Sequence, residues 1–192
     1  MKYAAGVVGL ALMLAGNVAS AKDILPRGWI KAGSLSAAYT VAVKPTGAYE
    51  GHAGVVIRSK RGNPKGFGTL MQTILANSYL GRRIRFSGYL RAQDVSGHAG
   101  LWMRVDGPNG DILGIDNMDK RSLHGNVPWK FCEIVMDIPD QAKTIAFGAL
   151  LSKAGEVEVS DLKFEIVGKD VPVTSKTRSS AYPQKPINLD FK

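Results

Sequence analysis

The residue types best suited to binding a ligand lie on two stretches of alternating polar and apolar side chains. Arg85, Ser87 and Tyr89 share one face of the first stretch, and Trp102, Arg104 and Asp106 share one face of the second. Successive side chains of a β-strand point to opposite faces, so each set should face away from the apolar residues of its strand. If the two strands are neighbours, these side chains form one patch of indole, phenol, guanidinium and carboxylate groups.

A patch of this composition is suited to sugars, because sugar C–H faces stack on aromatic rings while fixed polar side chains bind the hydroxyl groups. Gln72 and Asn117 are further polar residues expected to join it, with Glu133 as another candidate. The alternative is a structural outer face in which Arg85 or Arg104 forms an ion pair with Asp106 or Glu133. The sequence supports both interpretations equally.

No catalytic or metal-binding motif accompanies these residues. The chain has no G-x-S-x-G elbow, no H-E-x-x-H pair and no phosphate-binding loop. His52, His98 and His124 are too widely spaced for an i, i+4 metal pair, and the carboxylates between Asp106 and Asp119 fit no calcium loop. We therefore expect no metal, no cofactor and no enzymatic activity.

The single cysteine, Cys132, alternates with Ile134, Met136 and Ile138 on an apolar face. A reactive thiol needs a base and an accessible, electropositive setting, so a buried, inert thiol is the prediction here. One cysteine also excludes a disulfide framework and a cysteine-rich zinc site.

Composition and periodicity predict the fold class. A chain of 192 residues, 45% hydrophobic and 21% charged, matches one globular domain. Its 22 glycines make up about 11% of the chain, against a usual ~7%, and favour a turn-rich, all-β protein. We expect about ten strands in a jelly-roll or galactose-binding-like β-sandwich, with an open barrel as the alternative. The expected strands cover residues 28–34, 39–44, 54–59, 68–75, 83–92, 101–106, 111–116, 129–138, 144–151 and 156–167.

Two of these stretches carry more detailed expectations. Residues 144–151 are nearly all apolar, which is typical of a strand buried on both faces. The alternation in residues 156–167 changes phase at Ser160-Asp161, which predicts a β-bulge.

The two ends of the chain differ from the middle. Residues 1–21 resemble a secretory signal peptide, with Lys2, a short apolar run and the small-residue site Ala19-Ser20-Ala21. The apolar run is too short for the ~20 residues of a membrane span, although an uncleaved anchor is the alternative. Residues 22–170 then form the sandwich. Residues 171–192 form an extended arm in which the alternation at 186–191 predicts a docking strand.

The net charge of +9 favours acidic partners such as anionic glycans, although it could serve solubility alone. Arg58, Lys60, Arg61 and Lys65 cluster in one loop rich in Gly and Pro. Export to the periplasm or the medium argues against a role in binding DNA.

Several runs also resemble a known domain. They are residues 66–72, 83–90, 100–107, 116–118, 145–148, 161–165 and 188–191. Together they resemble the galactose-binding-like, carbohydrate-module-like sandwich found appended to AraC-type bacterial regulators. The resemblance implies the same fold over most of the chain, but the predicted signal peptide stands where a regulator would carry its DNA-binding helices.

These observations predict a secreted, non-catalytic binding module for a glycan or another polar ligand, with anionic ligands included. The alternative is a structural or protein-interaction component of the bacterial envelope built on the same scaffold.

Overall fold

The computed structural model describes residues 25–60 and 62–174. Within them the chain is all-β, with three 3-10 turns, and no described helix is long and apolar enough to cross a membrane. The strands are β1 (Ile30–Ala32), β2 (Tyr39–Lys44), β3 (Gly54–Ser59), β4 (Phe67–Leu75), β5 (Arg83–Asp106), β6 (Ile112–Asp116), β7 (Leu123–Asp137), β8 (Thr144–Ser152) and β9 (Glu156–Val167).

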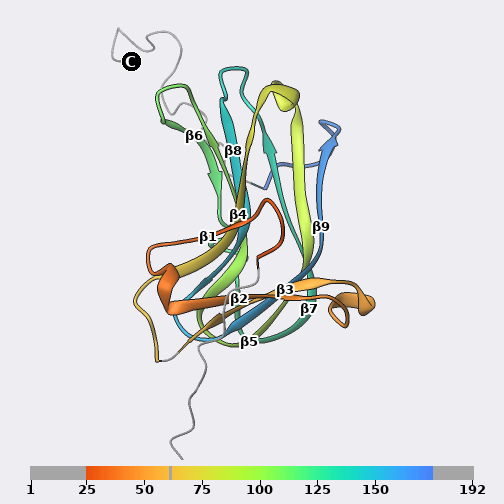
Figure 1. Cartoon of the computed structure of the whole chain (residues 1–192). Helices are drawn as coiled ribbons and strands as arrows, with labels where there is room; N and C mark the ends of the chain where they lie inside the picture. The colour runs from red at the N-terminus through yellow and green to blue at the C-terminus, as the bar shows by residue number, and fades with distance from the viewer. Residues whose placement is uncertain (1–24, 61, 175–192) are drawn as a thin grey trace, which may run out of the picture.

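The strands form a β-sandwich in which one long strand belongs to both layers (Figure 1). The first sheet contains β1, β4, β8, the C-terminal half of β5 and β6. The second contains β2, β3, β9, the N-terminal half of β5 and β7. All pairs are antiparallel, and the sharing of β5 makes the sheet nearly closed. The predicted all-β sandwich is confirmed, although the stretches 83–92 and 101–106 are one strand rather than two.

A bend in β5 carries the chain from one sheet to the other. Asp94 adopts a left-handed conformation, with φ of 51°, at the start of the bend. The turn between β8 and β9 packs against it so closely that a Cβ on Gly155 would lie 2.7 Å from the Asp94 carbonyl oxygen. Only glycine fits there, since Gly155 also has a φ of 124°.

The bend changes which residues of β5 face the core. Ile84 and Phe86 are buried in the N-terminal half, whereas Leu101, Met103 and Val105 are buried in the C-terminal half. Even-numbered residues therefore face inward before the bend and odd-numbered residues after it. Both sets join one continuous hydrophobic core.

Three local predictions are confirmed. Cys132 is buried in the core with 3% of its surface exposed. Strand β8 is buried along nearly its whole length, from Ile145 to Leu151. A bulge occurs in β9, where Asp161 has a φ of 50° and the pairing with β5 shifts register.

The predicted signal peptide, its cleavage site and the docking strand at 186–191 lie outside the described residues. The first part of the predicted arm, up to Thr174, is described. Thr174 donates its N–H to the Val135 carbonyl at 2.9 Å and accepts the Val135 N–H at its hydroxyl at 2.8 Å. The arm therefore begins along the edge strand β7.

Candidate functional site

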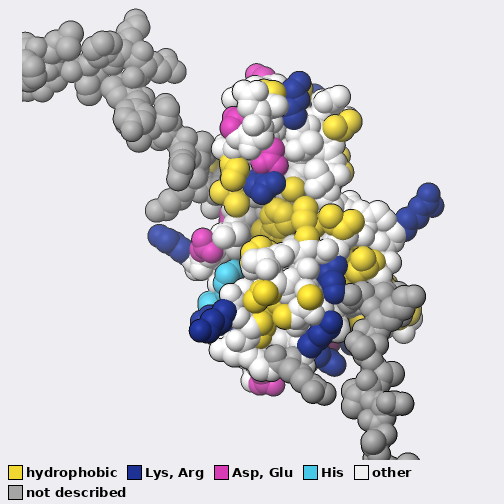
Figure 2. Space-filling model, turned by 60° about the vertical axis from the view of Figure 1, so that its left-hand side comes forward, with side chains coloured by type: hydrophobic (Ala, Val, Ile, Leu, Met, Phe, Trp, Pro, Cys, Tyr) yellow, Lys and Arg dark blue, Asp and Glu magenta, His cyan; other side chains and the backbone are white. Residues whose placement is uncertain are grey.

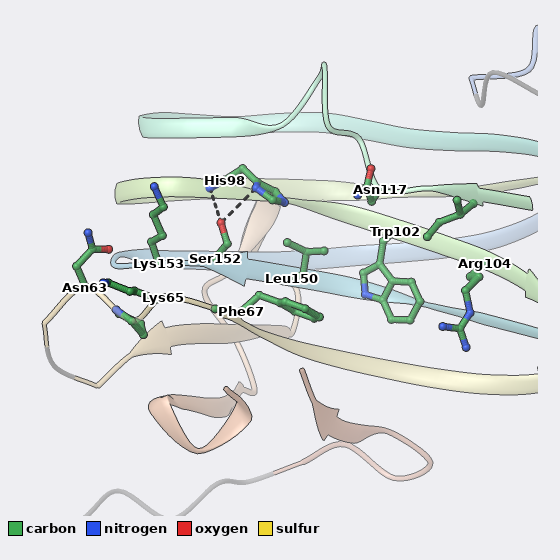
Figure 3. A pocket seen from close by; sticks show the side chains of 13 residues that line it. Asn63, Lys65, Phe67, His98, Trp102, Arg104, Asn117, Leu150, Ser152 and Lys153 are labelled. Atoms are coloured by element: carbon green, nitrogen blue, oxygen red, sulfur yellow. Dashed lines mark hydrogen bonds between the residues drawn. The ribbon is translucent and has the colours of Figure 1, made fainter. Parts of the chain in front are cut away.

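A groove of about 870 Å³ lies on the outer face of the first sheet. Its walls come from β4, β8, β6 and the C-terminal half of β5, together with the loop that precedes β4 (Figure 3). The lining residues are Asn63, Pro64, Lys65, Gly66, Phe67, His98, Trp102, Arg104, Ile115, Asn117, Leu150, Ser152 and Lys153.

Trp102 forms part of the groove floor. Its backbone pairs with Gly148 on β8, and its indole N–H donates a 2.7 Å hydrogen bond to the Thr69 hydroxyl on β4. The Thr69 hydroxyl in turn donates to the Ala149 carbonyl at 2.7 Å. The indole can cross β8 because Gly148 has no side chain, and any Cβ there would collide with the Leu70 carbonyl. One edge of the ring is therefore fixed while the residue lines the groove.

Apolar side chains surround this indole. Phe67 is 37% exposed and Ile115 is 51% exposed, while Leu150 is buried in the sheet between them. Figure 2 shows hydrophobic side chains gathered in the middle of this face, with Lys and Arg side chains around them. The groove thus offers exposed rings and apolar surface within a polar rim, the arrangement expected of a small-ligand site.

Arg104 lines the groove, but its charge is largely compensated. Its guanidinium forms an ion pair with Asp106, with Nε 2.9 Å from Oδ1, and Nη2 donates to Oδ2 at 3.0 Å. The Asp106 side chain is only 14% exposed and does not line the groove. The alternative prediction, a structural ion pair between Arg104 and Asp106, is therefore correct.

The turn after β6 positions Asn117. Asp116 accepts the Met118 N–H at 2.9 Å and pairs with Arg121 at 2.6 Å. Met118, which has a φ of 58°, is buried and accepts the Leu101 N–H at its sulfur at 3.3 Å. These anchors hold the turn against β5, so that Asn117 reaches the groove.

The opposite end of the groove is polar. The Ser152 hydroxyl accepts the backbone N–H of His98 at 2.9 Å and lies 3.2 Å from Nδ1 of the His98 ring. Burial lowers the pKa of His98, which favours the neutral ring at neutral pH. Asn63, Lys65 and Lys153 complete this end (Figure 3).

The single patch predicted from the sequence is wrong. Tyr89 and Arg85 lie on the outer face of the second sheet, on the other side of the sandwich from Trp102. The bend in β5 separates them, because outward positions before and after it face opposite sides of the molecule. Gln72 pairs with Phe147 and lies on the core-facing side of β4. Ser87 is buried, with 2% of its surface exposed, and is not available to a ligand. Of the predicted residues, Trp102, Arg104 and Asn117 come together.

The residues on the second sheet form their own contacts. Tyr89 stacks on Tyr49, with ring centroids 3.6 Å apart and planes 9° apart. The ring of Trp129 meets Tyr49 edge-on, and Arg91 lies over that indole at 5.5 Å. The Arg85 guanidinium forms a 3.1 Å ion pair with Glu165. These residues are therefore paired with one another. Arg85 forms a structural ion pair, as the alternative predicted, but its partner is Glu165 rather than Asp106 or Glu133.

Sequence reasoning missed the polar end of the groove. The cluster of basic residues around Lys65 was a signal for this loop, but nothing local linked it to Phe67, His98 or Ser152. These residues are far apart in the chain and meet through the pairing of β4, β8 and β5. Among residues 25–60 and 62–174, no group of three or more His, Cys, Asp or Glu side chains is placed to hold a metal ion.

Comparison with known proteins gives one relative in sequence and many in fold. No protein-family model matches the chain. It is 34% identical over 166 residues to YbfP of Bacillus subtilis, an uncharacterized helix-turn-helix-type transcriptional regulator, covering 86% of this chain. The chain spans 56% of that regulator's length. The AraC-type part of the resemblance stays a prediction.

Several solved structures with a similar fold are carbohydrate-binding modules, and another is the enzymatically active domain of tailspike protein 4 of bacteriophage CBA120, with a TM-score of 0.52 and 14% identity over 73% of this chain and 20% of that one. The CBM22-1 xylan-binding domain of Paenibacillus barcinonensis Xyn10C superimposes with a TM-score of 0.52 and 15% identity, over 74% of this chain and 88% of that one. The tandem CBM22-1–CBM22-2 domain of the same protein gives 0.54 and 14%, over 73% and 41% of the two chains. A family 16 carbohydrate-binding module gives 0.51 and 13%, over 66% and 86%. These likenesses support the sandwich fold.

Proposed function

We propose that this chain is a secreted, non-catalytic module that binds a glycan in the groove of the first sheet. The observation that carries the proposal is the indole of Trp102, fixed at one edge by Thr69 in a groove that also exposes Phe67. Aromatic surface that is held in place loses little conformational entropy when a sugar ring stacks on it. Polar side chains at both ends of the groove, such as Asn117 and Ser152, supply partners for hydroxyl groups.

The fold shared with xylan-binding modules supports the same function. The ion pair between Arg104 and Asp106 also fits a binding role, because Asp106, which lies outside the groove lining, holds the guanidinium that lines the groove. An interaction role in the envelope is the second candidate. It is favoured by Phe131 on the second sheet, which is 47% exposed beside the stacked ring of Tyr89.

A glycan array probed with the purified full chain tests the glycan-binding proposal. The strongest hit is then measured by calorimetry against Trp102→Ala, which should lose at least roughly tenfold in affinity, as truncation of an aromatic hot spot does. Trp129→Ala is the matched control, because it removes an indole from the opposite sheet and should retain affinity. Trp102→Phe should keep much of the affinity, since it retains a ring and loses only the bond to Thr69.

Melting curves of the variants separate binding from folding. Trp102→Ala loses one hydrogen bond, worth about 1 kcal/mol, and the packing of a half-buried indole. The variant should remain folded, because Trp102 is not part of the hydrophobic core. Full affinity in a folded Trp102→Ala protein would contradict the proposed site. Absence of any glycan ligand, with capture of an envelope protein dependent on Phe131, would favour the second candidate.

A further inference from the structure

The charged side chains that line the groove are all positive. Its lining includes three cationic side chains, Lys65, Lys153 and Arg104, and no aspartate or glutamate. Asp106 compensates the charge of Arg104. Lys65 and Lys153 are both exposed and form no ion pair with any described residue. The uncompensated positive charge is therefore concentrated at the end of the groove opposite Arg104 (Figure 3).

The backbone of Lys153 is held in an unusual conformation. Its φ of 59° lies in the left-handed region, which disfavours residues that carry a Cβ. Its N–H donates to the Gly66 carbonyl at 3.0 Å, and its own carbonyl accepts the Tyr39 hydroxyl at 3.0 Å. Glycine or asparagine would adopt this conformation at lower cost. The turn geometry alone therefore does not account for a lysine at this position.

The two lysines belong to segments that are tied together. The bond from Lys153 to Gly66 joins the turn between β8 and β9 to the loop that carries Lys65. Asn63 braces the same turn, because its side-chain oxygen accepts the Ala154 N–H at 3.3 Å and the Ser96 hydroxyl at 3.2 Å. This leaves the Asn63 amide nitrogen as a donor. Two ammonium groups and one amide at one end of a groove match a ligand group that only accepts hydrogen bonds.

We infer that the groove binds an acidic glycan, whose carboxylate or sulfate group lies between Lys65 and Lys153 while a sugar ring stacks on Trp102. This inference rests on the proposed glycan-binding function and narrows it to a ligand class. The carboxylate and the sulfate share the required chemistry, namely negative charge and several acceptor oxygens.

Matched ligand pairs provide the test. Oligogalacturonate and its methyl ester differ in charge at the carboxyl group, and dextran sulfate differs from dextran in its sulfates. Calorimetry with the full chain should show a preference for the charged member of one of the two pairs. The pair that shows it identifies the anion as a carboxylate or a sulfate. The preference should weaken as salt is raised from low to physiological ionic strength, because the lysines are exposed and screened.

Substitutions of Lys65 and Lys153 test whether these two side chains cause the preference for acidic ligands. Lys65→Gln and Lys153→Asn should each reduce affinity for the acidic ligand by roughly threefold, and the double variant by roughly tenfold. Asparagine at position 153 tolerates the left-handed backbone, so folding should be retained. Lys130→Gln, which removes an exposed lysine from β7, is the control for net charge and should change little.

The outcomes separate the two proposals. Equal binding of charged and neutral members, or an unchanged double variant, overturns the acidic-ligand inference while glycan binding stands. If neither the array nor the matched pairs give any glycan binding, both proposals are overturned. If Lys130→Gln weakens the binding of acidic ligands as much as the double variant does, the effect comes from net charge in general. That result also overturns the inference.

Discussion

Cys132 has its thiol among core side chains of β7, and burial raises its pKa. The thiolate is the reactive form, so both low accessibility and a raised pKa slow its reaction. We expect slow modification of the native protein by a chromogenic disulfide reagent at pH 8 and rapid modification after denaturation. Fast native labelling, or a disulfide-linked dimer on a non-reducing gel, would show that the thiol is accessible.

Asp137 gives a pH-dependent contribution to stability. Two hydrogen bonds of 2.9 Å from the Arg83 guanidinium, together with Lys169, lower its pKa from the ordinary value of 3.8 to about 2. A carboxylate with a lowered folded-state pKa stabilises the protein above its unfolded pKa, and this contribution is lost as the pH falls from about 4 to about 2.

Asp137→Asn should therefore melt at a lower temperature than the unmodified protein at pH 6, and the difference should shrink towards pH 2. Thermal melts followed by circular dichroism at pH 6, 4, 3 and 2 measure it. Asp140→Asn is the control, because this exposed carboxylate forms no ion pair with any residue that the structure describes. A difference that stays constant over this pH range would mean that ionisation of Asp137 does not contribute to stability.

At the scale of elements, the start of the C-terminal arm fastens three parts of the fold. Thr174 exchanges two hydrogen bonds with Val135 of β7, and its hydroxyl donates to Asp116 at the end of β6 at 2.8 Å. Arg83 donates to the carbonyls of Lys169 and Val171 at 2.8 and 2.6 Å. The arm therefore closes the free edge of β7 at the point where β6 approaches it.

Truncation after Val173 should lower the melting temperature by several degrees, because each lost hydrogen bond is worth about 1 kcal/mol. Truncation after Thr174 isolates the predicted strand at 186–191. If that strand docks, burial of Leu189 and Phe191 is worth ~1.5–3 kcal/mol for each, and this variant is destabilised as well. Calorimetric melting of both variants gives the comparison. An unchanged curve after the second truncation would mean a free arm.

At the scale of the whole molecule, strand β5 and one continuous core join the two sheets, so we expect the groove and the second sheet to unfold together. Export is the remaining prediction at this scale. The site Ala19-Ser20-Ala21 predicts that the exported protein begins at Lys22. N-terminal sequencing of material from the periplasm or medium measures it. A protein recovered there with Met1 at its start would refute cleavage, and one confined to the cytoplasm would refute export.

The sequence by itself determined whatever depends on neighbours along the chain. The alternation of apolar residues was enough to identify the all-β class, the buried strand β8, the bulge at Ser160-Asp161 and the inward-facing Cys132. It also identified Trp102 as a residue facing away from Leu101 and Met103. All of these follow from the two-residue period of a strand, which is a local property.

Only the tertiary structure decided which outward faces meet. The left-handed Asp94 and the packing of Gly155 against it turn β5 from one sheet into the other, which sends Tyr89 and Trp102 to opposite sides of the sandwich. Pairing of distant strands then brings Ser152 to His98, 54 residues away in the chain. Local periodicity carries no information about such pairings, because strand partners are selected by burial of side chains from the whole chain in one core.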